Sequence, residues 1–262
     1  MKIQLAPSLM CSDFRNLESE IRLFERKGIE LLHLDIMDGR FVPNITMGPP
    51  VVKAIAAMTR LTLDIHLMLS APEDFIPVMA SVGRPATPRA AKPAPRPAGK
   101  PATRPACKPA TRRAGKPATR RAGKPIISVH VESGRPLKKL IHSIRKCGAR
   151  PAVAINPCTP LAALEPVLGD VELILMMCVQ PGFAGQKLVP GSIERIAELK
   201  EMLKRRKVSP LIEVDGNTSF ENIRRMVAAG ANVIVAGTSC LYRKDKPLEP
   251  ALDEFLAFLA TV

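Results

Sequence analysis

The stretch LLHLDIMDG, residues 31–39, is a short apolar run that ends in ionisable side chains and a glycine. Apolar runs of this length are typical of buried strands. Because side chains alternate along a strand, His33, Asp35 and Met37 share one face. We therefore expect a buried strand that presents polar groups at its carboxyl end.

Seven further runs of this kind lie on either side of that stretch, and longer helical patterns separate them. We expect strands at about 3–7, 31–37, 61–68, 126–131, 151–156, 171–179, 211–215 and 232–236. We expect helices at about 13–28, 48–57, 72–82, 135–147, 159–167, 190–206, 218–229 and 248–260. Strict alternation indicates an α/β protein with parallel strands, and eight strand–helix pairs favour a (β/α)8 TIM barrel over a doubly wound sheet. The 262 residues suit one such domain over 1–262.

One segment interrupts this alternation between the third expected helix and the fourth expected strand. Residues 83–122 repeat an eight-residue unit, from GRPATPRA to GKPATRRA, and contain no Val, Ile, Leu or Phe. Proline blocks helix and sheet, and a segment with little to bury has nothing to offset its ordering entropy. We interpret 83–122 as a disordered, low-complexity insert with polyproline II character.

The charge of the chain belongs largely to this insert. The formal net charge is +15, with 39 basic and 24 acidic residues, and 83–122 hold 12 of the basic residues and no acidic one. Without the insert the counts are 27 and 24, a net charge of +3. The globular part is thus nearly balanced. The insert is interpreted first as a solvated linker or a repeat expansion without a selected role, and any weak, non-specific binding of polyanions would come from it.

The remaining bulk features favour a cytoplasmic protein that does not enter a membrane. No apolar run approaches the ~20 residues of a membrane span, and the first residues, MKIQLAPSLMCSD, lack the apolar core of a signal peptide. The six cysteines form no C-x-x-C pair and suggest no disulfide framework. We expect reduced cysteines, with Cys11, Cys158, Cys178 and Cys240 as small buried thiols rather than nucleophiles.

Polar side chains gather at the carboxyl ends of three expected strands, where the active sites of barrels lie. Asp64 and His66 share a face in DIHLM, as His33 and Asp35 do in the opening stretch, and Asp215 ends another run. Imidazole and carboxylate groups are suitable ligands for Zn, Fe or Mn. Single histidines on strands are more often packed core residues, so both a metal site and a polar core remain open at this point.

Glycine-containing segments follow the last three expected strands. They read GFAGQ at 182–186, GN at 216–217 and GTS at 237–239. Barrels often hold phosphate with the backbone N–H groups of their last loops. Each segment alone is equally typical of a turn, but three in successive loops favour a phosphate site.

These motifs together resemble the ribulose-phosphate 3-epimerase family, which includes ribulose-phosphate and allulose-6-phosphate 3-epimerases. The resemblance covers the whole chain except the insert. It is carried by APSLMCSD at 6–13, HLDIMDGRFVPN at 33–44, DIHLM at 64–68, HVE at 130–132, NPCTP at 156–160, MCVQPGFAGQ at 177–186, EVDGN at 213–217 and AGTS at 236–239.

The resemblance implies one divalent metal ion (Zn, Fe, Mn or Co) per chain. We also expect the chain to form a homo-oligomer. It implies metal ligands at His33, Asp35, His66 and Asp215, and an acid/base pair formed by Asp35 and Asp215. The substrate would contact Ser8, Met37, Met68 and Met177. Its phosphate would contact Gly182, Phe183, Ala184, Gly185, Gly216, Asn217, Gly237, Thr238 and Ser239. Asn217 and Ala184 depart from the family pattern, in which glycine often stands at these positions.

The implied activity is epimerisation at C3 of a ketose phosphate through an enediolate. The first expectation is conversion of D-ribulose 5-phosphate to D-xylulose 5-phosphate, in the pentose phosphate pathway. SLMC, GFAGQ and GTS look more like the branch that converts D-allulose 6-phosphate to D-fructose 6-phosphate. Related decarboxylases and aldol-type synthases carry D-x-K-x-x-D, whereas residues 35–40 read DIMDGR. A different class, a non-catalytic barrel that binds nucleic acid through its insert, also remains open.

Overall fold

The computed structural model describes residues 3–82 and 123–262. The expected disorder of the insert at 83–122 falls outside the described residues. The helices and strands on both sides of it form one continuous arrangement, so the alternation resumes where the insert ends.

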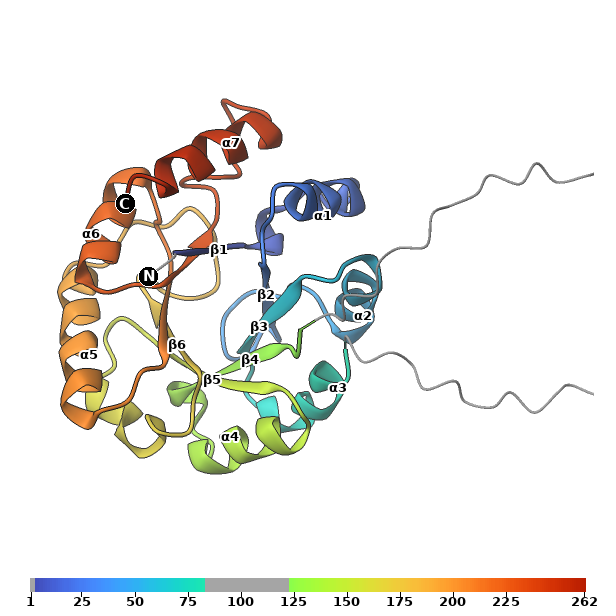
Figure 1. Ribbon diagram of the computed structural model, residues 1–262. Coiled ribbons are helices and arrows are strands. Elements are labelled where there is room, and N and C mark those ends of the chain that lie inside the picture. Colours follow the sequence, from blue (N-terminus) through green and yellow to red (C-terminus); the bar gives the residue numbers. More distant parts are fainter. Residues whose placement is uncertain (1–2, 83–122) are drawn as a thin grey trace, which may run out of the picture.

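The described residues form an eight-stranded parallel sheet that is rolled into a barrel (Figure 1). Hydrogen-bonded neighbours follow the order β1-β8-β7-β6-β5-β4-β3-β2, and a parallel bridge between Ser8 and His33 joins the two ends of this order. The predicted barrel is confirmed. The strands are β1 Gln4–Pro7, β2 Leu31–Met37, β3 Thr62–Met68, β4 Ile126–His130, β5 Arg150–Ile155, β6 Leu173–Met177, β7 Leu211–Asp215 and β8 Val233–Ala236.

Helices surround the barrel and cover its outer face (Figure 1). They are α1 Leu17–Arg26, α2 Pro49–Met58, α3 Ile76–Ala80, α4 Leu137–Lys146, α5 Ser192–Arg206, α6 Phe220–Ala229 and α7 Leu248–Leu259. Short 3-10 helices precede or replace some of them: η1 Leu9–Cys11, η2 Pro72–Asp74, η3 Val131–Ser133 and η4 Leu161–Val167. No helix among the described residues is long and apolar enough to cross a membrane.

Two expected helices differ from the structure. The helix expected at 72–82 is divided into the 3-10 helix η2 and the short helix α3. The expected helix at 159–167 is instead the 3-10 helix η4, Leu161–Val167, after β5. Pro166 lies inside this segment, and its ring removes a backbone donor and clashes with the preceding turn of an α-helix. The amphipathic pattern was therefore interpreted correctly as helical, but the proline limits it to short, tight turns.

Two apolar layers hold the barrel together. Outward-facing residues such as Leu32, Leu34 and Ile36 pack against the helices, whereas a smaller set fills the interior. Ala152 and Ala154 belong to the interior set, and they lie beside Ser128 and His130 in the register of β4 and β5. Small side chains on β5 thus leave interior volume for imidazole rings.

The described chain resumes after the insert at the face of the barrel that lies away from the strand carboxyl ends. Gly123 lies directly against Thr62, the first residue of β3. Deleting 83–122 would join Val82 to Gly123 near this face. Because the cost of loop closure grows only logarithmically with length, we expect the deletion variant to fold with a melting temperature within a few degrees of the full chain.

The measurement is a thermal melt followed by far-UV circular dichroism, together with a nucleic-acid titration at two salt concentrations. We expect salt-sensitive polyanion binding to be lost with the insert. An insoluble variant, or one without a cooperative melt, would contradict this account of the barrel.

Candidate active site

A cluster of four ligand-type side chains lies at the carboxyl ends of β2, β3 and β7. His33, Asp35, His66 and Asp215 each offer one nitrogen or oxygen atom, and these atoms all lie within 4.8 Å of one another. The pairing of β2 with β3 places Asp35 beside His66. Two imidazole nitrogens and two carboxylate oxygens form a donor set that suits a divalent transition metal, so the residues fit such an ion.

Asp35 is the centre of this cluster. Its Oδ1 lies 3.2 Å from His33 Nε2 and 3.1 Å from His66 Nδ1, and the Ser8 hydroxyl donates to its Oδ2 at 2.8 Å. The remaining ring nitrogens of both histidines face away from Asp35. His33 Nε2 and His66 Nδ1 are therefore the nitrogens that converge on one point with the carboxylates.

Burial and neighbouring charge separate the pKa values of the two aspartates. Burial opposes ionisation of Asp35, but His33 and His66 outweigh it and lower the pKa of its carboxyl. Burial raises the pKa of Asp215 to about 7, and the charge of Asp35 adds to this rise. Two nearby carboxyl groups with separated pKa values can act as a proton donor and a proton acceptor near neutral pH.

A second pair of carboxyl groups lies below the cluster, and the sequence analysis gave it no role. Asp64 Oδ2 accepts a hydrogen bond from His33 Nδ1 at 2.6 Å, and Glu213 lies behind it, fully buried. Burial, followed by the charge of Asp64, raises the pKa of Glu213 well above its usual range. The hydrogen bond from His33 Nδ1 to Asp64 therefore fixes the imidazole ring with its Nε2 toward the cluster.

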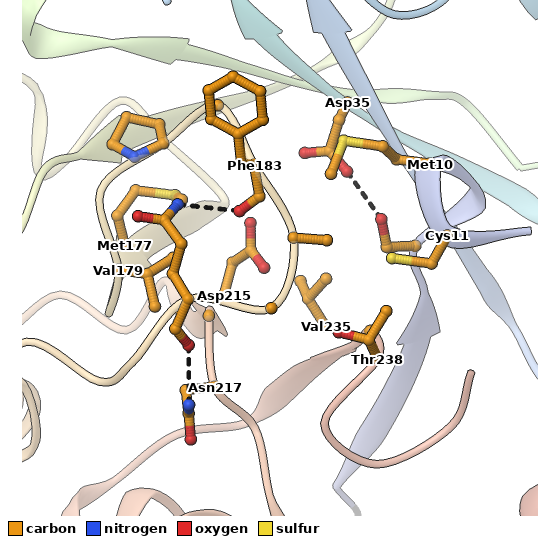
Figure 2. Close-up of a pocket in the computed structure, with 18 of the residues that line it drawn as sticks. Met10, Cys11, Asp35, Met177, Val179, Phe183, Asp215, Asn217, Val235 and Thr238 are labelled. Carbon is orange, nitrogen blue, oxygen red and sulfur yellow. Dashed lines mark hydrogen bonds between the residues drawn. The ribbon is translucent and has the colours of Figure 1, made fainter. Parts of the chain in front are cut away.

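A pocket of about 320 Å³ opens above the two aspartates. Figure 2 shows Asp35 and Asp215 reaching into it, with Met177 and Val179 on one side and Met10 and Cys11 on the other. Every residue that was predicted to contact substrate or phosphate lines this pocket, whereas His33 and His66 lie beneath it. Further residues line the pocket that were not predicted from the sequence, and they include Met10, Val179, Gln180, Pro181, Gln186, Thr218 and Val235.

Three amide side chains hold the loop at 180–186 that closes one end of the pocket. Asn44 Nδ2 donates to the Gly182 carbonyl at 2.7 Å, and Gln186 Nε2 donates to the Phe183 carbonyl at 2.9 Å. Asn217 Nδ2 donates to the Gln186 carbonyl at 2.8 Å and so ties this loop to the one after β7. Asn44 and Gln186 belong to the FVPN and GFAGQ motifs, so the sequence contained a signal from which their role in holding this loop could have been predicted.

Asn217, one of the departures from the family pattern, has a local explanation. Its φ of 49° lies in the left-handed region, which glycine adopts freely and asparagine tolerates better than most residues. Asn222 Nδ2 donates to Asn217 Oδ1 at 2.8 Å and fixes its side chain. The asparagine therefore keeps the backbone geometry and adds a hydrogen bond to the neighbouring loop.

Cys11, Cys178 and Cys240 are not arranged as nucleophiles. Burial raises the pKa of Cys178 to about 12 and that of Cys240 to about 11. Burial, followed by the charges of Asp35 and Asp215, also raises the pKa of Cys11 to about 12. The prediction of a buried thiol is confirmed for Cys178 and Cys240 but was wrong for Cys158, which is exposed in the loop after β5, and for Cys11, which is only half-buried at the pocket.

Comparison with known proteins identifies the family to which this site belongs. The profile of the "Ribulose-phosphate 3 epimerase family" matches residues 4–87 and 113–241. This chain belongs to the ribulose-phosphate 3-epimerase family. The match is interrupted inside the repeat insert. The members of this family are epimerases, which are isomerase-class enzymes. The resemblance stated from the motifs is therefore confirmed.

Named relatives are similar along nearly the whole chain. The ribulose-phosphate 3-epimerase of Bacillus subtilis is 35% identical over 245 residues, which cover 93% of this chain and 94% of the relative. The ribulose-phosphate 3-epimerase of Synechocystis is 37% identical over 239 residues, covering 90% of this chain and 86% of that one.

Solved structures with the same fold are more distant in sequence. The crystal structure of KGPDC from Streptococcus mutans has a TM-score of 0.64 at 10% identity, covering 99% of this chain and 98% of its own. A mutant tryptophan synthase α-subunit from Pyrococcus furiosus has a TM-score of 0.62 at 11% identity, covering 98% and 100%. These similarities show the barrel fold alone.

The donor set leads to a prediction about metal content. We expect the purified protein to hold about one divalent ion per chain, and His66→Ala to lose it, because one of only four ligands is removed. Elemental analysis and melting temperatures with and without added metal would measure both effects, since an ion that binds the folded state raises its stability. His142→Ala, at an exposed position on α4, is the matched control. Equal metal content in both variants would contradict the assignment.

Proposed function

We propose that this protein interconverts D-ribulose 5-phosphate and D-xylulose 5-phosphate with a divalent metal ion bound by His33, Asp35, His66 and Asp215. The observation that carries this proposal is the meeting of Asp35 and Asp215 in one pocket, together with a metal-type donor set. Family membership supplies the reaction class, and the names of the relatives support the pentulose phosphate.

Epimerisation at C3 of a 2-ketose requires two proton carriers. One group removes the C3 proton from one face of the substrate, and another returns a proton to the opposite face of the resulting enediolate. Asp35 at the end of β2 and Asp215 at the end of β7 enter the pocket from different strands, with β1 and β8 between them. We assign these two roles to the two aspartates, and the direction of reaction decides which one accepts first.

The remaining groups bind the substrate and protect the intermediate. When bound, a divalent ion supplies Lewis-acid stabilisation of the negative charge that develops on the substrate oxygens. Met37, Met68 and Met177 line the pocket around the aspartates, and their thioethers exclude water without donating protons. The glycine-containing loops after β6, β7 and β8 would hold the phosphate through backbone N–H groups. Ser8 keeps Asp35 oriented through its hydrogen bond of 2.8 Å.

The hexulose alternative is tested by comparing substrates. Relative kcat/KM values on D-ribulose 5-phosphate and D-allulose 6-phosphate would decide between them, and a preference for the hexulose would overturn the proposed substrate. Assembly into a homo-oligomer and a cytoplasmic location stay predictions.

The paired aspartates lead to the most direct mutational test. We expect Asp35→Asn and Asp215→Asn each to lower kcat by ~10³-fold or more, because each change removes a proton carrier and a metal ligand. Exchange of the C3 hydrogen with deuterium from solvent, followed by NMR, should fall with turnover. Asp38→Asn, at the rim of β2 outside the pocket lining, serves as a comparison. Turnover near that of the wild type in either aspartate variant would refute the two-base mechanism.

Gly216 allows a test of the phosphate loop. Its φ is 110°, and an added Cβ would lie 2.5 Å from the Val179 side chain and 2.9 Å from the Val179 backbone nitrogen. We expect Gly216→Ala to move the loop after β7 and to raise KM for the sugar phosphate at least ~10-fold, with a backbone cost of about 1–3 kcal/mol.

Gly134→Ala is the matched control for this variant. Gly134 also has a positive φ, 68°, but no atom lies within 4 Å of its added Cβ. The Gly134→Ala variant should have a lower melting temperature because of backbone strain, and its KM should be unchanged. Steady-state kinetics and thermal melts on both variants separate the two effects, and an unchanged KM in Gly216→Ala would exclude this loop from phosphate binding.

A further inference from the structure

A line of hydrogen-bonded side chains continues from His66 away from the pocket. His66 Nε2 lies 2.8 Å from His130 Nε2, and His130 Nδ1 lies 2.9 Å from Glu132 Oε2. The two imidazoles are fully buried, and Glu132 in η3 reaches the edge of the barrel mouth. Neither His130 nor Glu132 lines the pocket that holds the aspartates.

The geometry determines which atom donates in each of these hydrogen bonds. His66 Nδ1 faces Asp35 Oδ1 at 3.1 Å, so Nδ1 is the atom that His66 offers to the metal cluster. A neutral imidazole that uses Nδ1 as a ligand carries its proton on Nε2. His66 Nε2–H therefore donates to His130 Nε2. His130 must then carry its own proton on Nδ1, and it donates to the Glu132 carboxylate.

The far end of this line is held in place. Glu132 Oε1 accepts from the backbone N–H of Asn156 at 2.8 Å, so each carboxylate oxygen has a defined partner. The planes of the His130 and His66 rings are inclined by only 26° with their centroids 5.0 Å apart, as an in-plane hydrogen bond between them requires, and the centroid of the Phe41 ring lies 4.8 Å from that of His130. These contacts fix both imidazole planes.

Each of the two imidazoles in the cluster is thus linked by hydrogen bonds to a carboxylate, but through a different number of side chains. His33 donates directly to the Asp64 carboxylate at 2.6 Å, whereas His66 reaches a carboxylate through a second imidazole. A carboxylate behind a histidine ligand fixes its tautomer and ring orientation and increases its basicity as a ligand.

We propose that His130 and Glu132 are positioning residues that act through His66, holding its Nδ1 in place as a ligand for the divalent metal. This inference rests on the metal site of the proposed function. It assigns no contact with the substrate to either residue. A purely structural alternative is that Glu132 only ties η3 to the segment after β5 through Asn156.

The test compares metal affinity among variants that keep the volume of the site. Glu132→Gln removes the charge but leaves an amide oxygen that can accept from His130, and we expect its dissociation constant for Zn²⁺ to rise 10- to 100-fold. The constant is measured by competition with a chromophoric chelator on the full chain. Glu172→Gln is the matched control, because Glu172 pairs with Arg150 at 2.7 Å at the opposite end of the strands.

His130 provides the second pair of variants. His130→Phe keeps an aromatic ring but leaves His66 Nε2–H without an acceptor, whereas His130→Gln can still accept this hydrogen bond. We expect the loss of metal affinity to be larger for Phe than for Gln. The visible spectrum of the Co²⁺-loaded protein should shift in both, because it reports the field around the ion directly.

Three outcomes are distinguishable. A Zn²⁺ dissociation constant for Glu132→Gln within two-fold of the wild type, with an unchanged Co²⁺ spectrum, would overturn the positioning role. Equal losses of melting temperature in the metal-free and metal-loaded variant, without a change in affinity, would also overturn it and favour the structural tie. A wild-type protein that binds neither ion would instead refute the metal site of the proposed function, before any variant is compared.

Discussion

The burial of ionisable side chains inside the barrel is the constraint on which the rest of the structure depends. Barrel interiors are ordinarily filled by branched apolar side chains. Here His33, Asp35, Asp64, His66, His130 and Glu213 are all buried. Charges removed from water are costly unless they are paired and hydrogen-bonded. The contacts of Asp35 with both imidazoles and Ser8, and of Asp64 with His33, supply that pairing for these four groups, so the polar interior is also the framework that orients the metal-type ligands. Burial instead raises the pKa of Glu213, which favours its uncharged form.

The barrel brings the two aspartates of this framework to one pocket because of the order of its strands. Parallel strands bring their carboxyl ends to one mouth, and the ring order places Asp35 and Asp215 on strands separated by β1 and β8. Two carboxyl groups can then approach one substrate carbon from different directions. Amide side chains tie the loop at 180–186 to its neighbours by donating to backbone carbonyl groups. Because these contacts use carbonyl groups, they leave the backbone N–H groups at the mouth available for an anion.

The basic insert and the barrel are separable in charge and in position. The residues outside 83–122 carry 27 basic and 24 acidic side chains, so most of the net charge of the chain belongs to the repeats. The family match breaks within the same segment. Because Gly123 lies against Thr62 at the start of β3, the attachment is at the end of the strands opposite to His66 and Asp35. Length can be inserted there without displacing the mouth of the barrel.

The sequence by itself determined the barrel, and its resemblance to the family supplied the candidate ligand set. Alternation of short apolar runs with helical patterns specifies parallel strands, and the period of two along LHLDIM and LDIHLM places His33, Asp35 and His66 on inward faces. Only the tertiary structure decided how the deeper groups act. The acceptor role of Asp64 and the line from His66 through His130 to Glu132 depend on contacts between strands, and no spacing along the chain encodes which ring nitrogen faces which oxygen. The 3-10 geometry of η4 was missed for another reason: Pro166 is visible in the sequence, but the hydrophobic pattern does not register a missing backbone donor.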